Sequence, residues 1–240
     1  MRHVFIADAH LRHPNDENYR RLLAFLETLS GTTDTLFILG DLFEFWIGYR
    51  KLAFPHFLPV LGQLRQLREN GVKIVYCEGN HDFHMGPYFK ETLDARISSG
   101  VMEVELDGRR VHLCHGDQIN RADYGYRMLR ALLHSPLTKL LTYVVPPSVA
   151  SALAEWMGGQ SRKKHARRRT RWDYHSILRR YAESLFASGC DVVVTGHFHQ
   201  PLVEPWECDS RRIIVSLGDW ITHFSYGEWV DGEITLKSFP

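Results

Sequence analysis

Short apolar runs recur along the chain, and each is followed at once by glycine or polar residues. The runs cover residues 4–7, 36–39, 72–77, 191–195 and 213–217. An apolar run of four to six residues with turn chemistry after it predicts a buried strand. These five segments are therefore expected to form the centre of the fold.

Between these runs the apolar residues change to a helical spacing. Residues 19–29, 57–70 and 174–186 each place leucine or other apolar side chains on one face, and glycine follows the first two segments. Residues 101–106 and 109–114 flank Asp107-Gly108, a pair that favours a tight hairpin turn. A last strand is expected near residues 233–239.

Helices between most strands, together with hairpins, favour an α/β fold of two mixed sheets packed face to face, with helices outside. A single doubly wound sheet fits less well, and the first strand lacks the glycine-rich loop of dinucleotide-binding folds. We expect one domain over residues 1–240 with a helical insertion at about 118–173. In this insertion, leucines suggest short helices broken at Pro136 and Pro146-Pro147, and residues 149–157 suggest another.

A basic run follows in the insertion, since residues 161–171 contain seven lysines and arginines and no acidic residue. Three interpretations stay open: a solvated face, a contact with membrane headgroups, or a grip on a substrate phosphate. The formal net charge of the whole chain is only +1, so we expect no stable nucleic-acid partner.

The four cysteines are widely spaced, which indicates reduced core residues. The N-terminus enters a strand directly and lacks a signal-peptide pattern. The longest stretch free of charged side chains, residues 140–154, has 15 residues and is too short to span a bilayer. A cytoplasmic location is therefore expected.

Residues of the types that commonly bind metals in proteins follow five of the predicted strands. Histidine is abundant, with 14 residues in 240, and it is the commonest metal ligand in proteins. Because ligands gather beyond the carboxyl ends of strands in α/β sheets, we expect these side chains to converge. Oxygen and imidazole donors suit Mn²⁺, Fe or Zn²⁺, and their number suits two divalent ions that share one carboxylate. The seven residues are Asp8, His10, Asp41, Asn80, His115, His197 and His199.

The order of these motifs resembles the calcineurin-like metallophosphoesterase family. The resemblance rests on Asp8-x-His10, Gly40-Asp41, Gly79-Asn80-His81-Asp82, His115-Gly116-Asp117 and Gly196-His197-x-His199. It implies a four-layer α/β/β/α sandwich. It also implies that Asp8, His10, Asp41 and His199 bind one ion, and that Asp41, Asn80, His115 and His197 bind the other.

Two ions held in this way would activate water and neutralise phosphoryl oxygens during in-line attack. His81 is not needed as a ligand, so we expect it to protonate the leaving oxygen or donate to the phosphate. Asp82 is expected to orient His81, with capping of the loop as the alternative role.

A closer resemblance is to UDP-2,3-diacylglucosamine hydrolases of lipid A biosynthesis, carried by residues 40–48 and by His115-Gly116-Asp117 followed by Asp123 and Tyr126. It implies Mn²⁺-dependent release of UMP from an acylated UDP-glucosamine at the inner-membrane surface, with the insertion as a lid over the acyl chains. The implied substrate contacts are Asn80, His81, Asp123, Tyr126, Ser161, Arg168 and His197. His81 is a departure, because the enterobacterial-type hydrolase has arginine there, whereas the wider phosphoesterase family has histidine; a fixed charge differs from a titratable donor.

Three alternatives stay open. The first is a hydrolase of soluble nucleoside diphosphates or phosphodiesters. The second is a metal-dependent nuclease whose basic run, residues 162–171, follows a phosphate backbone. The third is a binding protein without catalysis, which would be expected to have lost ligands, whereas all seven are present.

Overall fold

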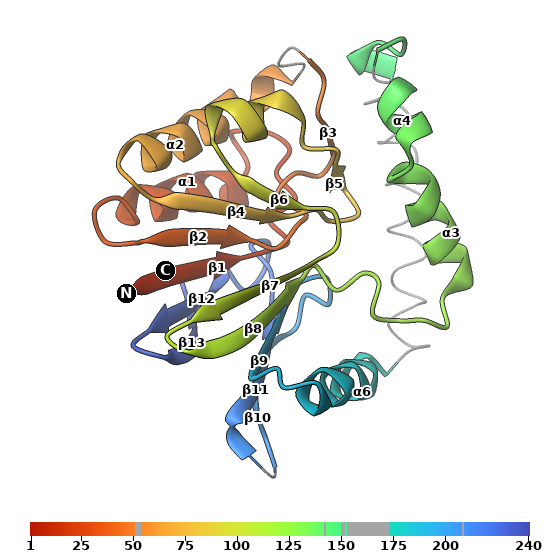
Figure 1. Ribbon diagram of the computed structural model, residues 1–240. Helices are drawn as coiled ribbons and strands as arrows, with labels where there is room; N and C mark the ends of the chain where they lie inside the picture. The colour runs from red at the N-terminus through yellow and green to blue at the C-terminus, as the bar shows by residue number, and fades with distance from the viewer. Residues whose placement is uncertain (51–53, 142, 150–151, 153–172, 208) are drawn as a thin grey trace.

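The computed structural model describes residues 1–50, 54–141, 143–149, 152, 173–207 and 209–240 (Figure 1). Its centre consists of two sheets. The first has six strands in the order β13 (Glu233–Ser238), β12 (Ser225–Val230), β1 (Arg2–Ile6), β2 (Thr35–Ile38), β4 (Lys73–Cys77) and β6 (Arg96–Ser98). The second has five, in the order β10 (Pro201–Trp206), β11 (Asp209–Leu217), β9 (Val192–Thr195), β8 (Arg109–Cys114) and β7 (Val101–Leu106).

Both sheets are mixed, with parallel strands in the middle. Strands β1, β2, β4 and β6 run parallel in the first sheet, and β8, β9 and β11 do so in the second. The antiparallel strands β12 and β13 complete the first sheet, while β7 and β10 form the edges of the second. A small separate pair joins β3 (Trp46–Ile47) and β5 (Asp82–Phe83).

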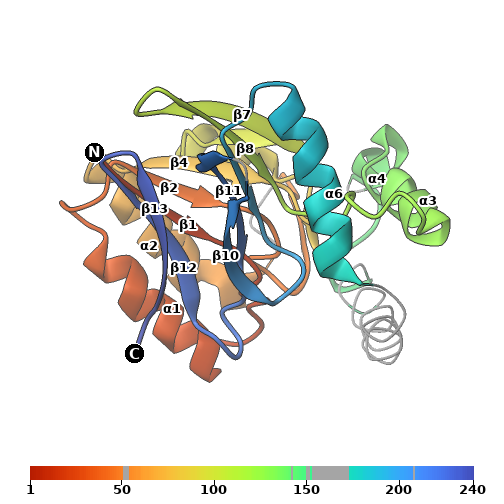
Figure 2. The same ribbon diagram turned by 90° about the horizontal axis from the view of Figure 1, so that it is seen from below.

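Each central strand is buried on both faces because its side chains alternate between two cores. In β1, Val4 and Ile6 pack toward α1 (Glu17–Thr28) and α2 (Leu58–Glu69), whereas Phe5 belongs to the core between the sheets. In the second sheet, Val193 and Ile214 pack toward α6 (Tyr174–Ala187). The strands therefore lie between α1 and α6 (Figure 2). This layering confirms the predicted α/β fold with two sheets flanked by helices.

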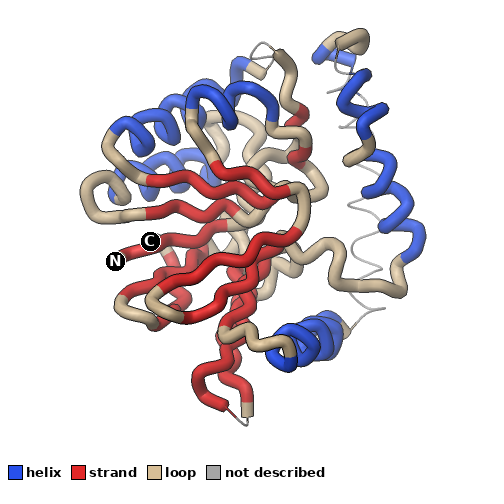
Figure 3. The backbone as a smooth tube through the Cα atoms, in the orientation of Figure 1, coloured by secondary structure: helices blue, strands red, loops and turns tan. Residues whose placement is uncertain are grey.

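The tube in Figure 3 shows the parallel strands ending in loops at the side of the molecule where α3 (Tyr124–Leu133) and α4 (Pro136–Leu141) stand. These two helices lie in the expected insertion, and α4 begins at Pro136 as predicted. Two short helical segments, η1 (Pro55–Phe57) and η2 (Tyr88–Thr92), are also present. Most of the predicted helix at 149–157 and the whole basic run lie outside the described residues.

Apart from the helix at 149–157, the predicted strands and helices are present within a few residues of their expected bounds, and the hairpin at 101–114 is confirmed. Several strands were not predicted. Strand β12 is an example, because Gly227 interrupts the apolar pattern from which a strand is predicted. The glycine packs closely in the sheet, since a Cβ there would lie 3.0 Å from Leu217 Cδ2. Cys77, Cys114 and Cys190 are buried free thiols as expected, and Cys208 lies outside the described residues. No helix within the described ranges has the length and apolar character to cross a membrane.

Candidate metal centre

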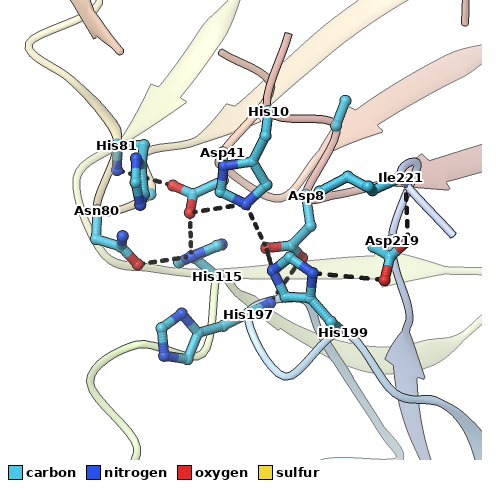
Figure 4. A network of polar contacts seen from close by, with 12 residues as sticks. Asp8, His10, Asp41, Asn80, His81, His115, His197, His199, Asp219 and Ile221 are labelled. Atoms are coloured by element: carbon cyan, nitrogen blue, oxygen red, sulfur yellow. Dashed lines mark hydrogen bonds and ion pairs between the residues drawn. The ribbon is translucent and has the colours of Figure 1, made fainter. Parts of the chain in front are cut away.

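The loops that follow five central strands meet at one edge of the molecule (Figure 4). Both sheets contribute, since β1, β2 and β4 belong to the first and β8 and β9 to the second. Parallel strands end at the same edge, and the packing of the two sheets places the two edges together. The residues brought together are the seven expected from the sequence: Asp8, His10, Asp41, Asn80, His115, His197 and His199.

Five of these seven residues adopt a left-handed backbone, which is uncommon for residues other than glycine. Their φ angles are 56° at Asp8, 45° at His10, 52° at Asp41, 70° at His197 and 53° at His199. Each of these conformations opposes the intrinsic preference of the backbone and persists because the surrounding structure fixes it. The next residues, Ala9, Leu11 and Leu42, return their side chains to the hydrophobic core.

One group of ligand atoms gathers around the carboxylate of Asp8. Its Oδ1 atom lies 3.3 Å from His199 Nε2 and 3.8 Å from His10 Nε2. These three side chains offer ligand atoms that all lie within 4.8 Å of one another. Asp8 Oδ2 instead accepts a hydrogen bond of 2.7 Å from the backbone N–H of His197, which holds the carboxylate in place.

A second group forms around Asp41, whose carboxylate lies between the two groups. Asp41 Oδ2 is 3.4 Å from His115 Nε2 and 3.7 Å from His10 Nε2. Asn80 Oδ1 lies 3.2 Å from the same His115 nitrogen. Asp8, Asp41 and His115 offer ligand atoms that also lie within 4.8 Å of one another. Asp41 Oδ2 thus faces His10 of the first group and His115 of the second, and Asp8 belongs to both groups.

The residues of the cluster fit a divalent cation. The buried Asp8 Oδ1 has no hydrogen-bond partner among the described residues, although it faces two imidazoles. Burial opposes ionisation of Asp41, but the neighbouring imidazoles, above all His115, hold its pKa well below the usual range. Burial and the charge of His115 lower the pKa of His197 to about 4, which keeps its ring neutral as a ligand must be. Carboxylate oxygens and imidazole nitrogens in such a group are the donors that Mn²⁺, Fe and Zn²⁺ take.

Three of the histidines are oriented from behind by an acceptor. His115 Nδ1 donates to the carbonyl of Leu39 at 2.8 Å, which leaves Nε2 without a proton in the neutral ring. His10 Nδ1 lies 3.4 Å from Glu44 Oε2, and His199 Nδ1 lies 3.4 Å from Asp219 Oδ2. Such partners fix the rings of metal-binding histidines and raise their basicity.

Glu44 and Asp219 also belong to the site, although neither was expected there from the sequence. A signal existed for Asp219, because Gly218-Asp219 follows an apolar run in the same way that Gly40-Asp41 does. Glu44 lies three residues beyond Asp41, and its contact with His10 depends on how two separate loops meet. No local sequence pattern indicates this contact.

Asp82 supports the cluster from inside the protein. Its buried carboxylate accepts hydrogen bonds from the backbone N–H groups of Asp41, Leu42, Phe43 and Gly79 and from the Tyr76 hydroxyl. Burial and the charge of Asp41 raise the pKa of Asp82 to about 7, whereas the surrounding donors favour the ionised form. None of these described bonds reaches His81, so the geometry agrees with the loop-capping alternative.

His81 lies beside both groups of ligands. Its backbone N–H donates to Asp41 Oδ1 at 2.9 Å, and its ring Nδ1 lies 2.8 Å from the carbonyl oxygen of Glu44. A carbonyl only accepts hydrogen bonds, so Nδ1 carries a proton. This bond fixes the orientation of the ring and leaves Nε2 as its other nitrogen.

Two of the expected substrate contacts are described on α3. Asp123 caps the helix by accepting a hydrogen bond from the backbone N–H of Tyr126 at 3.1 Å. The Tyr126 hydroxyl donates to Asp117 Oδ2 at 2.7 Å, and its ring centroid lies 6.2 Å from that of His197. Ser161 and Arg168 lie outside the described residues.

Two packed sheets that end in a cluster of histidines and carboxylates define a metal-dependent phosphoesterase. The chain belongs to the calcineurin-like phosphoesterase family, which its sequence matches over residues 1–201. Members of this family bind divalent metals.

Individual relatives cover the whole chain. UDP-2,3-diacylglucosamine hydrolase of Porphyromonas gingivalis is 32% identical over 253 residues, which cover 98% of this chain and 96% of that protein. The hydrolase of the same name from Tolumonas auensis is 32% identical and covers 100% of this chain and 98% of its own. Among solved structures, Vps29 of Chaetomium thermophilum covers 100% of both chains at 12% identity, with a TM-score of 0.46.

We expect Gly79→Ala to abolish metal binding. A Cβ at Gly79 would lie 2.1 Å from Asp41 Oδ1 and 2.6 Å from Asp41 N, so the carboxylate must move. Metal analysis after equilibration with Mn²⁺ checks this. The control is Gly62→Ala in α2, where a Cβ meets nothing within 4 Å. That change should keep the metal and stabilise the fold by about 0.5–1 kcal/mol. Wild-type metal content in Gly79→Ala would contradict the close packing of the two loops.

Asp219→Asn is expected to weaken metal binding by about 10- to 100-fold, because His199 loses the negative charge behind its ring. Asparagine keeps an oxygen for the backbone N–H groups of residues 221–223, which Asp219 Oδ1 accepts now. Titration with Mn²⁺ measures the change, and Asp209→Asn, at the opposite end of β11, serves as the control. Equal affinities would mean that Asp219 only shapes the turn after β11.

Proposed function

We propose that this chain hydrolyses the pyrophosphate bond of a diacylated UDP-glucosamine and releases UMP and the acylated sugar 1-phosphate. The observation that carries the proposal is similarity along the whole chain to proteins named UDP-2,3-diacylglucosamine hydrolase, at 32% identity. The complete ligand set at the strand ends supports hydrolysis as the reaction. The experiment below tests the substrate, because His81 stands where the resemblance to the enterobacterial-type hydrolase implies arginine.

The donor set would hold two divalent ions, and Mn²⁺ is the proposed metal. Asp8, His10, Asp41 and His199 would bind the first ion, and Asp41, Asn80, His115 and His197 the second. When bound, the ions would lower the pKa of a water molecule and neutralise charge on the phosphoryl oxygens. The remaining steps belong to side chains of the chain itself.

His81 is the proposed donor to the phosphate or to the leaving oxygen. The carbonyl of Glu44 fixes the ring through Nδ1, so a second proton, at Nε2, is the one available for transfer. Because hydrogen bonds hold both the backbone N–H and the ring of His81, the ring needs little reorganisation during the reaction. Asp82 acts indirectly in this account, because it positions the loops that carry Asp41 and Asn80.

The helical insertion is the proposed lid for the acyl chains. Its described helices leave many apolar side chains open to solvent, and Met128 (75% exposed) and Leu132 (58% exposed) are examples on α3. A set of this kind marks a surface for an apolar partner. Acyl chains of the substrate, or the membrane that contains them, would cover it, which makes the protein peripheral to the inner membrane in this proposal. The exposed set is Tyr124, Met128, Leu129, Leu132, Leu137, Leu140, Leu141, Tyr143, Val144 and Val149.

The purified protein with Mn²⁺ is expected to release UMP from UDP-2,3-diacylglucosamine in preference to soluble nucleoside diphosphate compounds and nucleic acids. Each substrate is tested in parallel, and chromatography measures the amount of nucleotide released from each. Release from the soluble panel together with none from the acylated substrate would refute the proposed specificity. Degradation of DNA or RNA with a steep dependence on salt would favour the nuclease alternative.

His81→Ala should slow turnover by about 100- to 10,000-fold if the ring transfers a proton in the reaction. Its metal content should stay at the wild-type level, because His81 is not a proposed ligand. The exposed His175→Ala on α6 is the matched control, since its side chain is 51% exposed and pairs with Glu204. Loss of metal from His81→Ala would indicate that His81 is itself a metal ligand.

A further inference from the structure

Helix α3 is attached to the rest of the protein mainly by polar contacts. None of its residues is fully buried, although Leu133 packs partly against the core below it. Met128 and Leu132 face solvent instead. A helix with so little buried apolar surface needs other contacts to keep one orientation. The described residues provide two such attachments, one along the helix and one at its end.

The first attachment is Asp117, whose side chain is buried. Its Oδ2 atom accepts hydrogen bonds from the Tyr126 hydroxyl at 2.7 Å and from Arg130 Nε at 2.5 Å. Arg130 also donates through Nη2 to the carbonyl of Ser99 at 2.7 Å. Asp117 stands two residues after His115, so this contact joins α3 to the loop that carries a metal ligand.

The second attachment is made by Glu78, His84 and His134. His134 directly follows α3, and its Nδ1 lies 3.4 Å from Glu78 Oε2. Both side chains are shielded from solvent, with 9% of His134 and 6% of Glu78 exposed. His84, which has a left-handed backbone, places Nε2 3.1 Å from the carbonyl oxygen of Leu133, the last residue of the helix.

Glu78 is also tied into the body of the protein. Its Oε1 atom accepts a hydrogen bond of 3.1 Å from the backbone N–H of Met85, and its own N–H donates to the carbonyl of Ser98. It stands two residues before Asn80. The two carboxylates that hold α3, Glu78 and Asp117, are therefore each two residues away from a proposed ligand of the second ion.

We propose that Glu78 and His134 are positioning residues that fix α3 relative to Asn80 and His115. Through them, the helix and the metal centre present one surface to a substrate that touches both. A small phosphodiester reaches only the metal centre and does not depend on the pair. The choice of an acylated UDP-sugar as the large substrate rests on the proposed function, whereas the attachment itself does not.

The test uses Glu78→Gln and His134→Gln in the metal-loaded protein, with Arg127→Gln on the exposed side of α3 as the control. Glutamine at position 78 keeps an acceptor for Met85 N–H and removes the charge that faces His134. Steady-state kinetics are measured with UDP-2,3-diacylglucosamine and with bis(p-nitrophenyl) phosphate. Hydrogen exchange over residues 124–134 and metal content are measured on the same samples.

Both variants should lose about tenfold or more in kcat/KM on the acylated substrate, mainly through KM, because α3 is no longer held in the productive position. Activity on bis(p-nitrophenyl) phosphate and metal content should stay within about twofold of wild type, and exchange over α3 should become faster. Arg127→Gln should change none of these quantities.

Equal losses on both substrates, accompanied by loss of metal, would overturn the proposal and assign the pair to support of the Asn80 loop. Unchanged hydrogen exchange over α3 would also overturn it. If the wild-type protein cleaves only the small phosphodiester, the proposed function fails, and faster exchange over α3 in the variants still supports the attachment.

Discussion

The buried carboxylate of Asp82 joins the loop after β2 to the loop after β4, and the metal centre depends on this junction. Asp82 accepts backbone hydrogen bonds from both loops, from Asp41 on one side and from Gly79 on the other. A buried carboxylate is tolerable only when donors surround it, and Tyr76 supplies a further one at 2.5 Å. The interaction sets where Asp41 begins its turn, and Asp41 in turn faces His10 and His115.

The rest of the fold makes this strained arrangement possible. The left-handed residues at the site are unfavourable one by one, and a loop on its own would relax them. They follow strands that are buried on both faces, with Val4 and Phe5 of β1 in two different cores. Such strands cannot shift without exposing apolar surface, so the strand ends are fixed points. A rigid scaffold that supports an unfavourable set of loops is what a preorganised site requires.

Much of the layout could be predicted from the sequence because it rests on local patterns. The apolar runs predicted the central strands, and the ligand-type residues after them predicted where the site would form. Residues that act through contacts between distant segments could not be found in this way. Glu44 behind His10 and Glu78 beneath His134 are pairs from separate loops, and neither stands in a pattern of its own. Gly227 shows the same limit for the fold, since it belongs to β12 because of close packing against Leu217 and Phe5.

The central claim is that the strand ends form one centre for two divalent ions, with Asp41 shared between them. Anomalous diffraction from crystals equilibrated with Mn²⁺ tests it most directly, because each ion then appears at its own position. We expect two anomalous peaks, both within coordination distance of the Asp41 carboxylate. One should lie beside His10 and His199, and the other beside His115 and His197. A single peak, or two peaks of which one does not touch Asp41, would contradict it.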